Sequence, residues 1–584
     1  MQQRVPPHEA IEGIRASPTA TTMLRPALLL RHEKLASAIT AHPVRLTVLI
    51  CLLWILPGLA GHDPWKPDEA QAFGVVHHLL ESHDWVVPML AGEPFLDKPP
   101  LVYLTAAFSG VLLSPFMPLH DAARLVSGAY MALTFLFVGF AAKELYGRSK
   151  SWISPLMLLG CGGLLLRAHQ LVTDVGLLLG LAMAFYALAL CARRKIVAGF
   201  WLGTGLGITI YSTGLVEPIM MVLVMVILPL VSPHWRTREY VATVLVAIFV
   251  MLPWAIGWPM ALHTRSPELF NEWLVTQNLL RLKGMLTIGP DDETFYHLRN
   301  LPWFTWPALP FALWALWSEG RAGLRKPGVL LPLVGFIVIL VFISALGEGR
   351  EIFGLPLLLP LALLATASVE KLPRGAMNAY YWFAIMLFTF FALVGWFYWM
   401  AIDFGVPVRL YKHMMKLQPE YLSAAHPLAI VAAMLITAAW FVLLFNIKRT
   451  AERPVAIWAA GVTTIWALIG LLLVNYIDTG KTYRSMVAQL VSALPPKYGC
   501  IYSQNLGEAQ RAMLYYFGNI TTERLEKNGP RPDCDMLITQ DNWKNPGELG
   551  PPWKIVWQGR RPGDKQERYR LYRQVPEAHE EAHK

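Results

Sequence analysis

Charged side chains are scarce in this sequence. Only 15% of its 584 residues are Asp, Glu, Lys or Arg, whereas 55% are hydrophobic. An ordinary soluble domain has about 25% charged residues, so the composition excludes a chain built only from such domains. The chain has a net charge of +10, but it lacks the mixture of aromatic and basic residues that marks an RNA-binding surface. We therefore predict no nucleic-acid partner.

Cysteines are also few. Three of the five, Cys51, Cys161 and Cys191, fall in apolar runs, and two, Cys500 and Cys534, fall in the polar C-terminal part. The outer pair could form a disulfide in an oxidising compartment or could remain two buried thiols. The spacing of the two residues leaves both alternatives open.

Two functional patterns are missing. The GKT at 480–482 is not a phosphate-binding loop, because Asn475 stands where that motif requires glycine and an apolar run precedes it. The sequence shows no internal repeat, whereas many transporters are built from inverted repeats. This absence counts against a lipid flippase, which is the main alternative of a different class.

Long apolar runs dominate what is present. A membrane-spanning helix needs about 20 mostly apolar residues, and the shorter runs are candidates as well. We predict a polytopic α-helical membrane protein with about thirteen transmembrane helices, near residues 46–60, 122–142, 151–167, 175–192, 197–212, 216–231, 240–260, 303–317, 328–345, 353–369, 378–402, 427–446 and 455–476.

Basic residues occur in every second loop, and this pattern sets the expected orientation. Lysine and arginine favour the cytoplasmic side of a membrane. The pattern predicts a cytoplasmic N-terminus and places the 62–101 loop, the 261–302 loop and the C-terminal part outside. The basic loop residues are Arg148, Lys150, Arg193, Arg194, Lys195, Arg236, Arg238, Arg321, Arg325, Lys326, Lys371, Arg374, Lys448, Arg449 and Arg453.

Three regions follow from these patterns. We predict a basic cytoplasmic tail at 1–45, a transmembrane domain at 46–477 with a catalytic loop at 61–120, and an extracytoplasmic α/β domain at 478–584. A cleavable signal peptide ending near Ala60 is the alternative for the first apolar run. We favour an uncleaved anchor, because the loop that follows must stay at the membrane.

The first loop is dense in polar residues for so apolar a protein. It contains Asp68 and Glu69 in PDEAQ, and Asp97 beside Lys98 in DKPP. Carboxylates next to a bilayer are costly and usually functional. The alternative is that the two aspartates only cap helices, which is a common role of acids at such positions.

The order of motifs in this loop resembles a known family. PDEA, then ESHDWVVPMLAGEPF, then DKPPLVY (ending at Tyr103) is similar to the first extracytoplasmic loop of the bacterial aminoarabinose (4-amino-4-deoxy-L-arabinose) lipid A transferases. That family is related to the protein O-mannosyltransferases. The resemblance implies a membrane glycosyltransferase of GT-C type, in the bacterial inner membrane, with an undecaprenyl-phosphate sugar as donor and lipid A as acceptor.

Further segments extend the resemblance. Asp174 lies in a segment similar to the family's "L.T.D", and SALGEGREIFGLPLLLP contains Arg350. In the 261–302 loop the family's asparagine and arginine are present as Asn278 and Arg281. IDTGKTYRSMVAQL resembles the family's entry to the C-terminal domain.

Three positions depart from the family pattern. Gln71 stands where an arginine is common, Thr213 stands where a lysine is typical, and Gln277 replaces a histidine. Each change removes a cation or a metal-capable ligand, so the donor and any metal are open questions. Asp97 could bind a divalent ion, but without the histidine we predict no metal site.

The chemistry of such a transfer assigns roles to these residues. Displacing a phosphate from the anomeric carbon calls for a general base, a second carboxylate and a cation for the departing phosphate. We expect catalysis by Asp68, Asp174 and Glu69, donor-phosphate binding by Lys98, Arg350 and Arg281, and substrate binding by Asp97, Gln71, Tyr103 and Asn278. The same fold could instead glycosylate a protein Ser or Thr or another envelope glycan.

Overall fold

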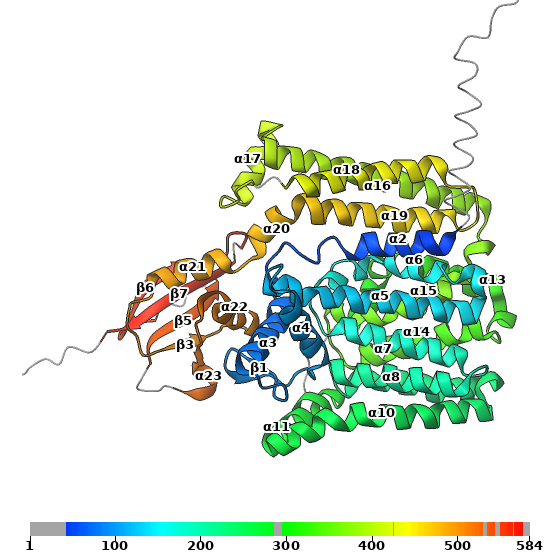
Figure 1. The fold of residues 1–584 in the computed structure, drawn as a ribbon, viewed down its shortest axis with the longest axis horizontal. Coiled ribbons are helices and arrows are strands. Elements are labelled where there is room, and N and C mark those ends of the chain that lie inside the picture. The colour runs from blue at the N-terminus through cyan, green and yellow to red at the C-terminus, as the bar shows by residue number, and fades with distance from the viewer. Residues whose placement is uncertain are drawn as a thin grey trace, which may run out of the picture.

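The computed structural model describes residues 42–284, 295–423, 426–529, 534–542, 549–564 and 566–575. A bundle of roughly parallel helices forms one side of the molecule and a sheet with its helices forms the other (Figure 1). Helices α3 (Asp68–Ser82) and α4 (Leu101–Leu113) lie between the two parts. The basic tail expected at 1–45 falls, up to residue 41, outside the described residues.

The bundle contains long helices and shorter apolar ones. In the described ranges, seven helices are long and apolar enough to cross a membrane, or eight if one bent pair is counted as a span. Several expected spans are shorter helices, so the count of thirteen is not established by length and composition. The bundle helices are α2 (Pro43–Ile55), α5 (Leu119–Tyr146), α6 (Ile153–Leu159), α7 (Asp174–Leu190), α8 (Lys195–Thr213), α9 (Val216–Val231), α10 (Arg238–Arg265), α13 (Ala308–Gly323), α14 (Pro327–Ala345), α15 (Leu358–Thr366), α16 (Arg374–Phe404), α18 (Pro427–Asn446) and α19 (Arg453–Leu468).

Shorter segments join these helices at the end of the bundle that faces the sheet. They include one π-helical stretch in the 261–302 loop and another that continues α19. The segments are α11 (Pro267–Asn271), η5 (Glu272–Leu280), α12 (Tyr296–Phe304), η6 (Glu351–Leu357), α17 (Val408–Leu417), η8 (Ile469–Leu473) and α20 (Val474–Lys481). The remaining short turns of helix are η1 (Arg148–Lys150), η2 (Gly162–Leu164), η3 (Arg167–His169), η4 (Pro233–Trp235) and η7 (Val369–Lys371).

Small residues allow the central helices to approach closely. A Cβ on Gly203 of α8 would lie 2.4 Å from the backbone oxygen of Ala247 in α10, and one on Gly205 would lie 2.6 Å from that of Gly180 in α7. Close backbone contact through small residues is how helices associate where lipid removes the hydrophobic driving force between them. These contacts fix α7, whose first residue reaches the site.

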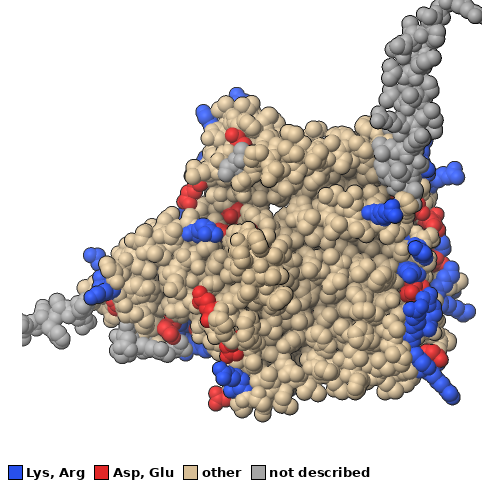
Figure 2. Space-filling model, viewed as in Figure 1, with Lys and Arg blue, Asp and Glu red and all other residues tan. Residues whose placement is uncertain are grey.

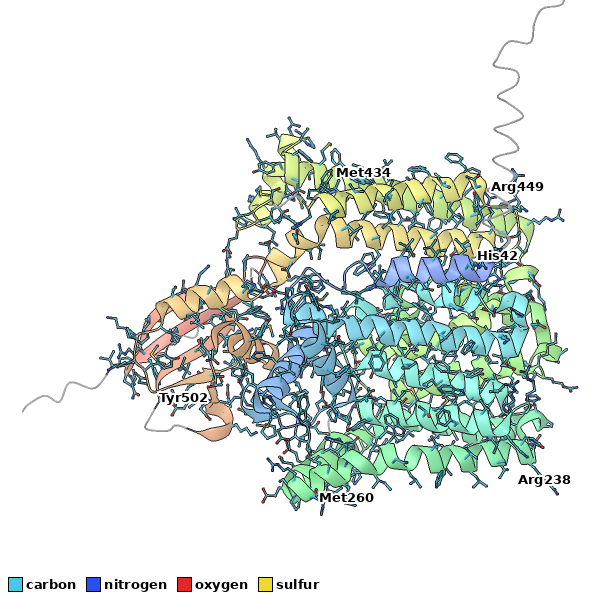
Figure 3. The ribbon with its side chains drawn as sticks, in the orientation of Figure 1. His42, Arg238, Met260, Met434, Arg449 and Tyr502 are labelled. Carbon is cyan, nitrogen blue, oxygen red and sulfur yellow. A yellow bond between two sulfur atoms is a disulfide. The ribbon has the colours of Figure 1, made fainter. Side chains whose placement is uncertain are left out.

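Charge is distributed unevenly along the bundle. Figure 2 shows Lys and Arg gathered at the end of the bundle away from the sheet, and Figure 3 places His42, Arg238 and Arg449 at that end. Tyr502, in the sheet, lies at the opposite end of the molecule. The alternating basic loops of the sequence therefore meet on one surface.

The C-terminal part is a mixed five-stranded sheet with the order β4-β3-β5-β7-β6. Strand β3 pairs in parallel with β4 and β5, and β7 pairs antiparallel with β5 and β6. Cys500 and Cys534 are opposite each other on β3 and β5 and form a disulfide. The elements are α21 (Arg484–Ala493), β3 (Cys500–Gln504), α22 (Glu508–Gly518), β4 (Glu523–Arg524), α23 (Leu525–Asn528), β5 (Cys534–Asn542), β6 (Trp553–Gly559) and β7 (Glu567–Gln574).

Candidate active site

A cleft opens between the bundle and the first loop. Its empty volume is about 480 Å³, part of which is open to solvent. Seven of the ten side chains expected at the site line it, and they come from segments far apart in the sequence. They are Asp68, Gln71, Asp97, Lys98, Tyr103, Asp174 and Arg350, joined by Ala72, Phe95, Val172, Thr173, Ile352 and Phe353.

Several helices begin at this cleft. Asp68 is the first residue of α3 and Asp174 the first of α7, Lys98 lies just before α4, and Arg350 immediately precedes η6. Helix N-termini carry partial positive charge and free N–H groups, so they favour anions. Neither Asp68 nor Asp174 caps its helix through a side-chain hydrogen bond. Helix capping therefore does not account for these two acids.

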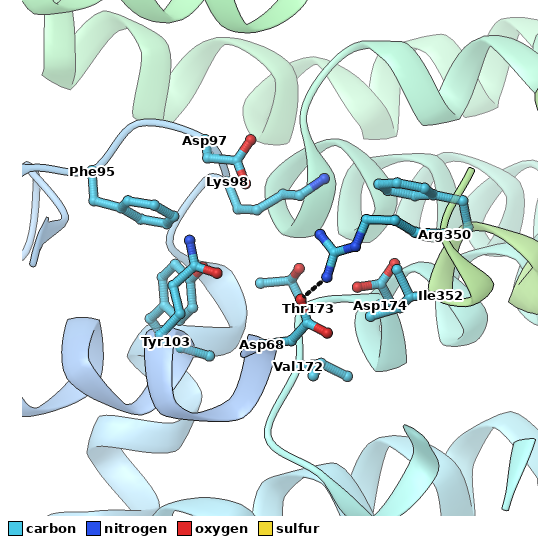
Figure 4. A pocket seen from close by; sticks show the side chains of 13 residues that line it. Asp68, Phe95, Asp97, Lys98, Tyr103, Val172, Thr173, Asp174, Arg350 and Ile352 are labelled. Atoms are coloured by element: carbon cyan, nitrogen blue, oxygen red, sulfur yellow. Dashed lines mark hydrogen bonds and ion pairs between the residues drawn. The ribbon is translucent and has the colours of Figure 1, made fainter. Parts of the chain in front are cut away.

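Two arginines hold Asp68. Arg350 donates from Nη2 to Oδ1 of Asp68, and Arg167 donates from Nη1 to Oδ2 at 2.9 Å. Arg350 belongs to the loop before η6 and Arg167 to the turn before α7, so the two cations approach the carboxylate from different segments. Figure 4 shows the guanidinium of Arg350 above Asp68 and beside the amine of Lys98. Arg350 thus pairs with Asp68 on the side of the cleft where Lys98 lies.

Two further acids line the cleft. Asp174 is 6% exposed, and its carboxylate has no hydrogen bond or ion pair within the described part of the chain. Asp97 lies on the opposite wall beside Phe95 (Figure 4). A buried carboxylate without a bonded partner is unfavourable unless a ligand or a proton compensates it. Asp174 is therefore available to a substrate.

Lys98 belongs to a buried ionic chain. Its amine lies 3.3 Å from Oε1 of Glu217, the same oxygen that accepts a hydrogen bond from Arg281 at 2.8 Å. Arg281 also binds Glu348, with Nε 2.5 Å from Oε1. Burial alone would lower the pKa of Lys98, but the negative charges of Glu217, Asp97 and Asp174 together outweigh that effect and raise it. Lys98 is thus held charged at the cleft, and Arg281 stands behind it rather than on the wall.

Two other expected site residues lie outside the cleft. Glu69 is 1% exposed and accepts bonds from Arg124 at 2.5 Å, from the Trp65 N–H at 3.1 Å and from the Leu171 N–H at 3.3 Å. Burial alone would raise the pKa of Glu69, but Arg124 outweighs that effect and lowers it. Glu69 therefore lies outside the cleft, with its carboxylate bonded to groups of the protein itself, and its catalytic role stays a prediction.

Asn278 is likewise a structural residue. Its Oδ1 accepts a hydrogen bond from the Leu215 N–H at 2.7 Å, and its Nδ2 donates to the Trp273 carbonyl at 2.8 Å. Gly214, which has a φ of +100°, lies against this side chain. Asn278 therefore secures the turn between α8 and α9 and is not among the residues that line the cleft, and its role in substrate binding stays a prediction.

The sheet domain completes one side of the site. Gln71 donates to Oε2 of Glu508 at the start of α22, with a distance of 2.6 Å. Burial, together with Asp97 and Glu93, raises the pKa of Glu508. The residue that replaces the family's arginine is therefore oriented by the C-terminal part of the chain.

More contacts dock this domain on the first loop. Asp63 binds Arg484 and accepts from the Thr482 hydroxyl at 2.6 Å, while Trp65 Nε1 donates to Asp478 at 2.8 Å. On the other side of the loop, Glu93 pairs with sheet-domain arginines. Its partners are Arg511 at 2.9 Å and Arg524 at 2.6 Å.

No group of three or more His, Cys, Asp or Glu side chains is placed to hold a metal ion within residues 42–284, 295–423 and the other described ranges. The cleft acids Asp68 and Asp97 are separated by cations (Figure 4). The cleft therefore presents both cations and carboxylates to a ligand.

Three important residues escaped sequence reasoning. Arg167 binds Asp68, Glu217 joins Lys98 to Arg281, and Arg124 holds Glu69. Each carried a signal that could have been used, because a charged residue inside or beside an apolar run is costly and usually paired. The sequence does not reveal which partner each one finds.

No family model matches the chain. It is similar to proteins named undecaprenyl phosphate-alpha-4-amino-4-deoxy-L-arabinose arabinosyl transferase. The Yersinia enterocolitica protein is 26% identical over 371 residues, 60% of this chain and 65% of that protein. The Pseudomonas savastanoi pv. phaseolicola protein is 27% identical over 456 residues, 75% of this chain and 79% of that protein.

Solved structures extend the similarity to the fold. The chain superposes on ArnT from Cupriavidus metallidurans bound to undecaprenyl phosphate with a TM-score of 0.66 and 18% identity, covering 91% of this chain and 98% of that one. The apo form of the same protein gives 0.63. The resemblance inferred from the first loop is thus confirmed, and the chain shares the fold of ArnT.

Proposed function

We propose that this protein is a membrane glycosyltransferase that moves a sugar from a polyprenyl-phosphate donor to an acceptor at the membrane surface. The donor is most simply undecaprenyl-phosphate 4-amino-4-deoxy-L-arabinose or a related sugar, and the acceptor lipid A, as the names of the relatives suggest. The observation that carries the proposal is the convergence of Lys98, Arg350, Asp68 and Asp174 on one cleft.

The cations would bind the donor phosphate. Lys98 and Arg350 share a wall of the cleft with the N-termini of α3, α7 and η6. Charge-assisted hydrogen bonds and helix N-termini both favour a phosphate, and both stabilise the negative charge that grows on it as it departs. Arg281 would act indirectly, by sharing Glu217 with Lys98.

Asp68 would take the proton of the acceptor hydroxyl. In the structure Arg350 occupies one of its oxygens, and a donor phosphate would compete for that arginine. Exchange of Arg350 from Asp68 to the phosphate would release the carboxylate as general base. Asp174, buried and without a bonded partner in the described chain, would stabilise the positive charge that develops on the sugar.

The arrangement in the membrane follows from the basic end of the bundle. We place that end in the cytoplasm and the cleft with the sheet domain at the outer face of a bacterial inner membrane. We take as crossings the thirteen helices of the bundle in the described ranges, the short ones included. The N-terminus is then cytoplasmic and the C-terminus periplasmic.

The deciding experiment measures transfer from a panel of undecaprenyl-phosphate sugars to lipid A by purified protein. Asp68→Asn should lower the rate at least about a hundredfold, since general-base catalysis contributes about 10²–10⁴-fold. Asp174→Asn should also be impaired. Glu268→Gln, an exposed acid in α11, is the matched control and should transfer at the rate of the unmodified protein.

Each outcome separates one part of the proposal. Normal transfer by both aspartate variants would retain the class of enzyme and overturn the assignment of the site. No transfer to lipid A, with transfer to a protein Ser or Thr or to another glycan, would overturn the acceptor. Movement of the intact donor across the membrane without any transfer would favour the flippase.

A further inference from the structure

Helix α17 (Val408–Leu417) differs from the other short helices at the sheet-facing end of the bundle. Gly405 ends α16 with a φ of +73° and Pro407 follows, so the chain turns sharply before α17 begins. Figure 1 shows α17 at the ends of α16 and α18, away from the sheet domain. Its sequence, VRLYKHMMKL, separates cations from apolar residues around the helix.

One arc of α17 packs inward. Met414 is buried, and Leu410 and Met415 pack against the same cluster, which contains Ile402, Tyr421 and Tyr476. This arc accounts for the position of the helix. It leaves a second group of apolar side chains without a protein partner.

That second group faces outward. Val408 is 57% exposed, Tyr411 37% and Leu417 41%. The exposed apolar surface continues along the chain from α16, where Phe404 is 63% exposed, through Val406 at 56%. In α16 and α18 only 22% and 17% of the apolar window is buried, so these are helices whose sides face lipid. The exposed edge of α17 that carries Val408 and Tyr411 therefore extends a lipid-facing surface.

A row of cations stands on the face of α17 opposite the packed arc, between Val408 and Leu417 around the helix. Arg409, Lys412 and Lys416 are exposed and stand at the i, i+3 and i+7 positions of one helix face. None of the three forms an ion pair with another described residue. Figure 2 shows basic side chains over this part of the molecule. They lie at the end of the bundle opposite the basic loops, so the alternation of those loops does not explain them.

We propose that α17 lies in the headgroup layer of the site-side leaflet and binds the phosphates of anionic lipids. Val408 and Tyr411 would enter the boundary of the acyl chains, and Arg409, Lys412 and Lys416, on the adjoining face, would reach the phosphates. A helix with a basic face and a separate apolar face is the form that interfacial helices take. Each cation near an anionic surface strengthens binding severalfold, and three together strengthen it about a hundredfold.

The position of α17 connects this surface to the first loop. The Tyr476 hydroxyl in α20 donates to the Met414 carbonyl at 2.8 Å, and Asp478 in the same helix accepts from Trp65 at 2.8 Å. Lipid contact at α17 would thus fix the position of α20 relative to the membrane surface. Through α20 it would also fix the position of the loop that lines the cleft. The proposal uses the membrane-embedded bundle and is independent of the identity of the donor and acceptor.

The test uses full-length protein in lipid nanodiscs, with Val408→Cys labelled by an environment-sensitive fluorophore. The native cysteines do not compete, since Cys51, Cys161 and Cys191 are buried and Cys500 is bonded to Cys534. With increasing phosphatidylglycerol in phosphatidylcholine discs, the emission should shift to the blue. Aqueous iodide should then quench the label at least fivefold less than in pure phosphatidylcholine.

Variants separate charge from shape. One triple variant removes the charges, through Arg409→Gln, Lys412→Gln and Lys416→Gln. It should show no blue shift in discs with up to half anionic lipid. A second triple variant keeps the charges, through Arg409→Lys, Lys412→Arg and Lys416→Arg, and should shift as the unmodified protein does. The matched control removes three exposed cations of the sheet side, through Lys497→Gln, Lys554→Gln and Arg560→Gln, and should respond like the unmodified charge set.

Three results would overturn the proposal. The label could remain equally open to iodide in every disc, or the neutralised and control variants could respond alike. Inorganic phosphate at millimolar concentration could produce the same shift in detergent, which would assign the cations to a free phosphate and not to a lipid surface. Because the readout is lipid contact, failure here is distinct from failure of the transfer assay.

Discussion

The two cations of the cleft wall are held in different ways. Lys98 is paired with Glu217 deep in the protein, while Arg350 is 29% exposed in its side chain and paired with Asp68. A pair between buried groups is fixed, whereas an exposed arginine can change partner at smaller cost. Lys98 therefore suits a permanent phosphate contact, and Arg350 suits one that forms when the donor arrives.

Replacing Lys98 tests the first of these roles. Lys98→Met keeps the length of the side chain and removes the charge, and a hydrogen bond to a charged group contributes about 1.5–3 kcal/mol. We expect kcat/KM for the donor to fall by about 10–100-fold, with little change in KM for the acceptor. Steady-state kinetics with each substrate varied in turn would measure this, and Lys554→Met in the exposed face of β6 is the control. An equal rise in both KM values would contradict a donor-phosphate role.

At the scale of single residues, the sequence motifs identified several side chains that the structure brings together. Asp68, Lys98, Asp174 and Arg350 reach one cleft. Glu69 does not, although it is adjacent to Asp68, because successive residues on a helix point about 100° apart and Glu69 faces Arg124 in the core. A one-dimensional pattern cannot distinguish the two acids without knowing which side of α3 is covered.

Helices α3 and α22 meet through the smallest side chains available. A Cβ added to Gly74 would lie 2.4 Å from the Cβ of Ala512. No ordinary contact is that short, so Gly74 is what permits the sheet domain to rest on the helix that carries Asp68 and Gln71. The fit between these two helices is an element of the site.

Gly74→Ala should separate the helices. Overpacking of a close interface typically costs about 1–3 kcal/mol, and we expect lower thermal stability and reduced transfer. Ala512→Gly should restore both properties in the double variant, because it removes the opposing Cβ. Thermal unfolding and activity of the two single variants and the double variant provide the cycle, and independent, additive losses would refute the contact.

Strand β2 (Glu93–Pro94), which pairs with β1 (Met89–Leu90), provides a second attachment. Burial alone would raise the pKa of Glu93, but Arg524 and Arg511 outweigh that effect and lower it below its ordinary value of 4.5. A carboxylate with a lowered pKa adds stability above its ordinary pKa and loses it as the pH falls through the lowered value. The attachment should therefore weaken below about pH 4.5.

Glu93→Gln checks this pH dependence. The variant should unfold a few degrees below the parent at pH 7, and the difference should shrink toward zero as the pH is lowered from about 4.5 to 3. Scanning calorimetry of both proteins across this range measures the difference, which cancels the effect of other acids. A difference that stays constant with pH would show that the carboxylate charge is not what holds β2.

Elements were predictable from hydropathy where they were long. Runs such as 240–260 and 378–402 correspond to α10 and α16, because lipid-facing helices are apolar throughout their length. The short helix α9 also coincides with the run expected at 216–231, whereas α6 and α15 are shorter than the runs expected at 151–167 and 353–369, because they are interrupted and buried among neighbours. Tertiary packing, which hydropathy does not record, decides where such helices end.

Across the whole molecule, the charges are distributed unequally between the two ends of the bundle. Basic loops gather at one end, and the cleft and sheet lie at the other (Figures 2 and 3). Single cysteines at Arg325 and Lys554, both exposed, should therefore report opposite sides of the membrane. In intact spheroplasts a membrane-impermeant maleimide should label Lys554→Cys at least about tenfold faster than Arg325→Cys.

Detergent permeabilisation is the internal control for this experiment. It should make the two positions react at similar rates, because both side chains are exposed in the structure. Equal labelling before permeabilisation, or faster labelling of Arg325→Cys, would reverse the proposed orientation and place the cleft on the cytoplasmic side.

The contacts between the first loop and the sheet domain also impose an order on biosynthesis. Asp63 and Arg484 are 421 positions apart, and Gln71 and Glu508 are 437 apart. The loop that carries Asp68 is translated before most of the bundle, and the residues that orient it are translated after the bundle, so most of the bundle must insert first. A chain that stalls between the bundle and the sheet domain would occupy the membrane without the contacts that orient this loop, and those contacts would form only once the sheet domain has been made.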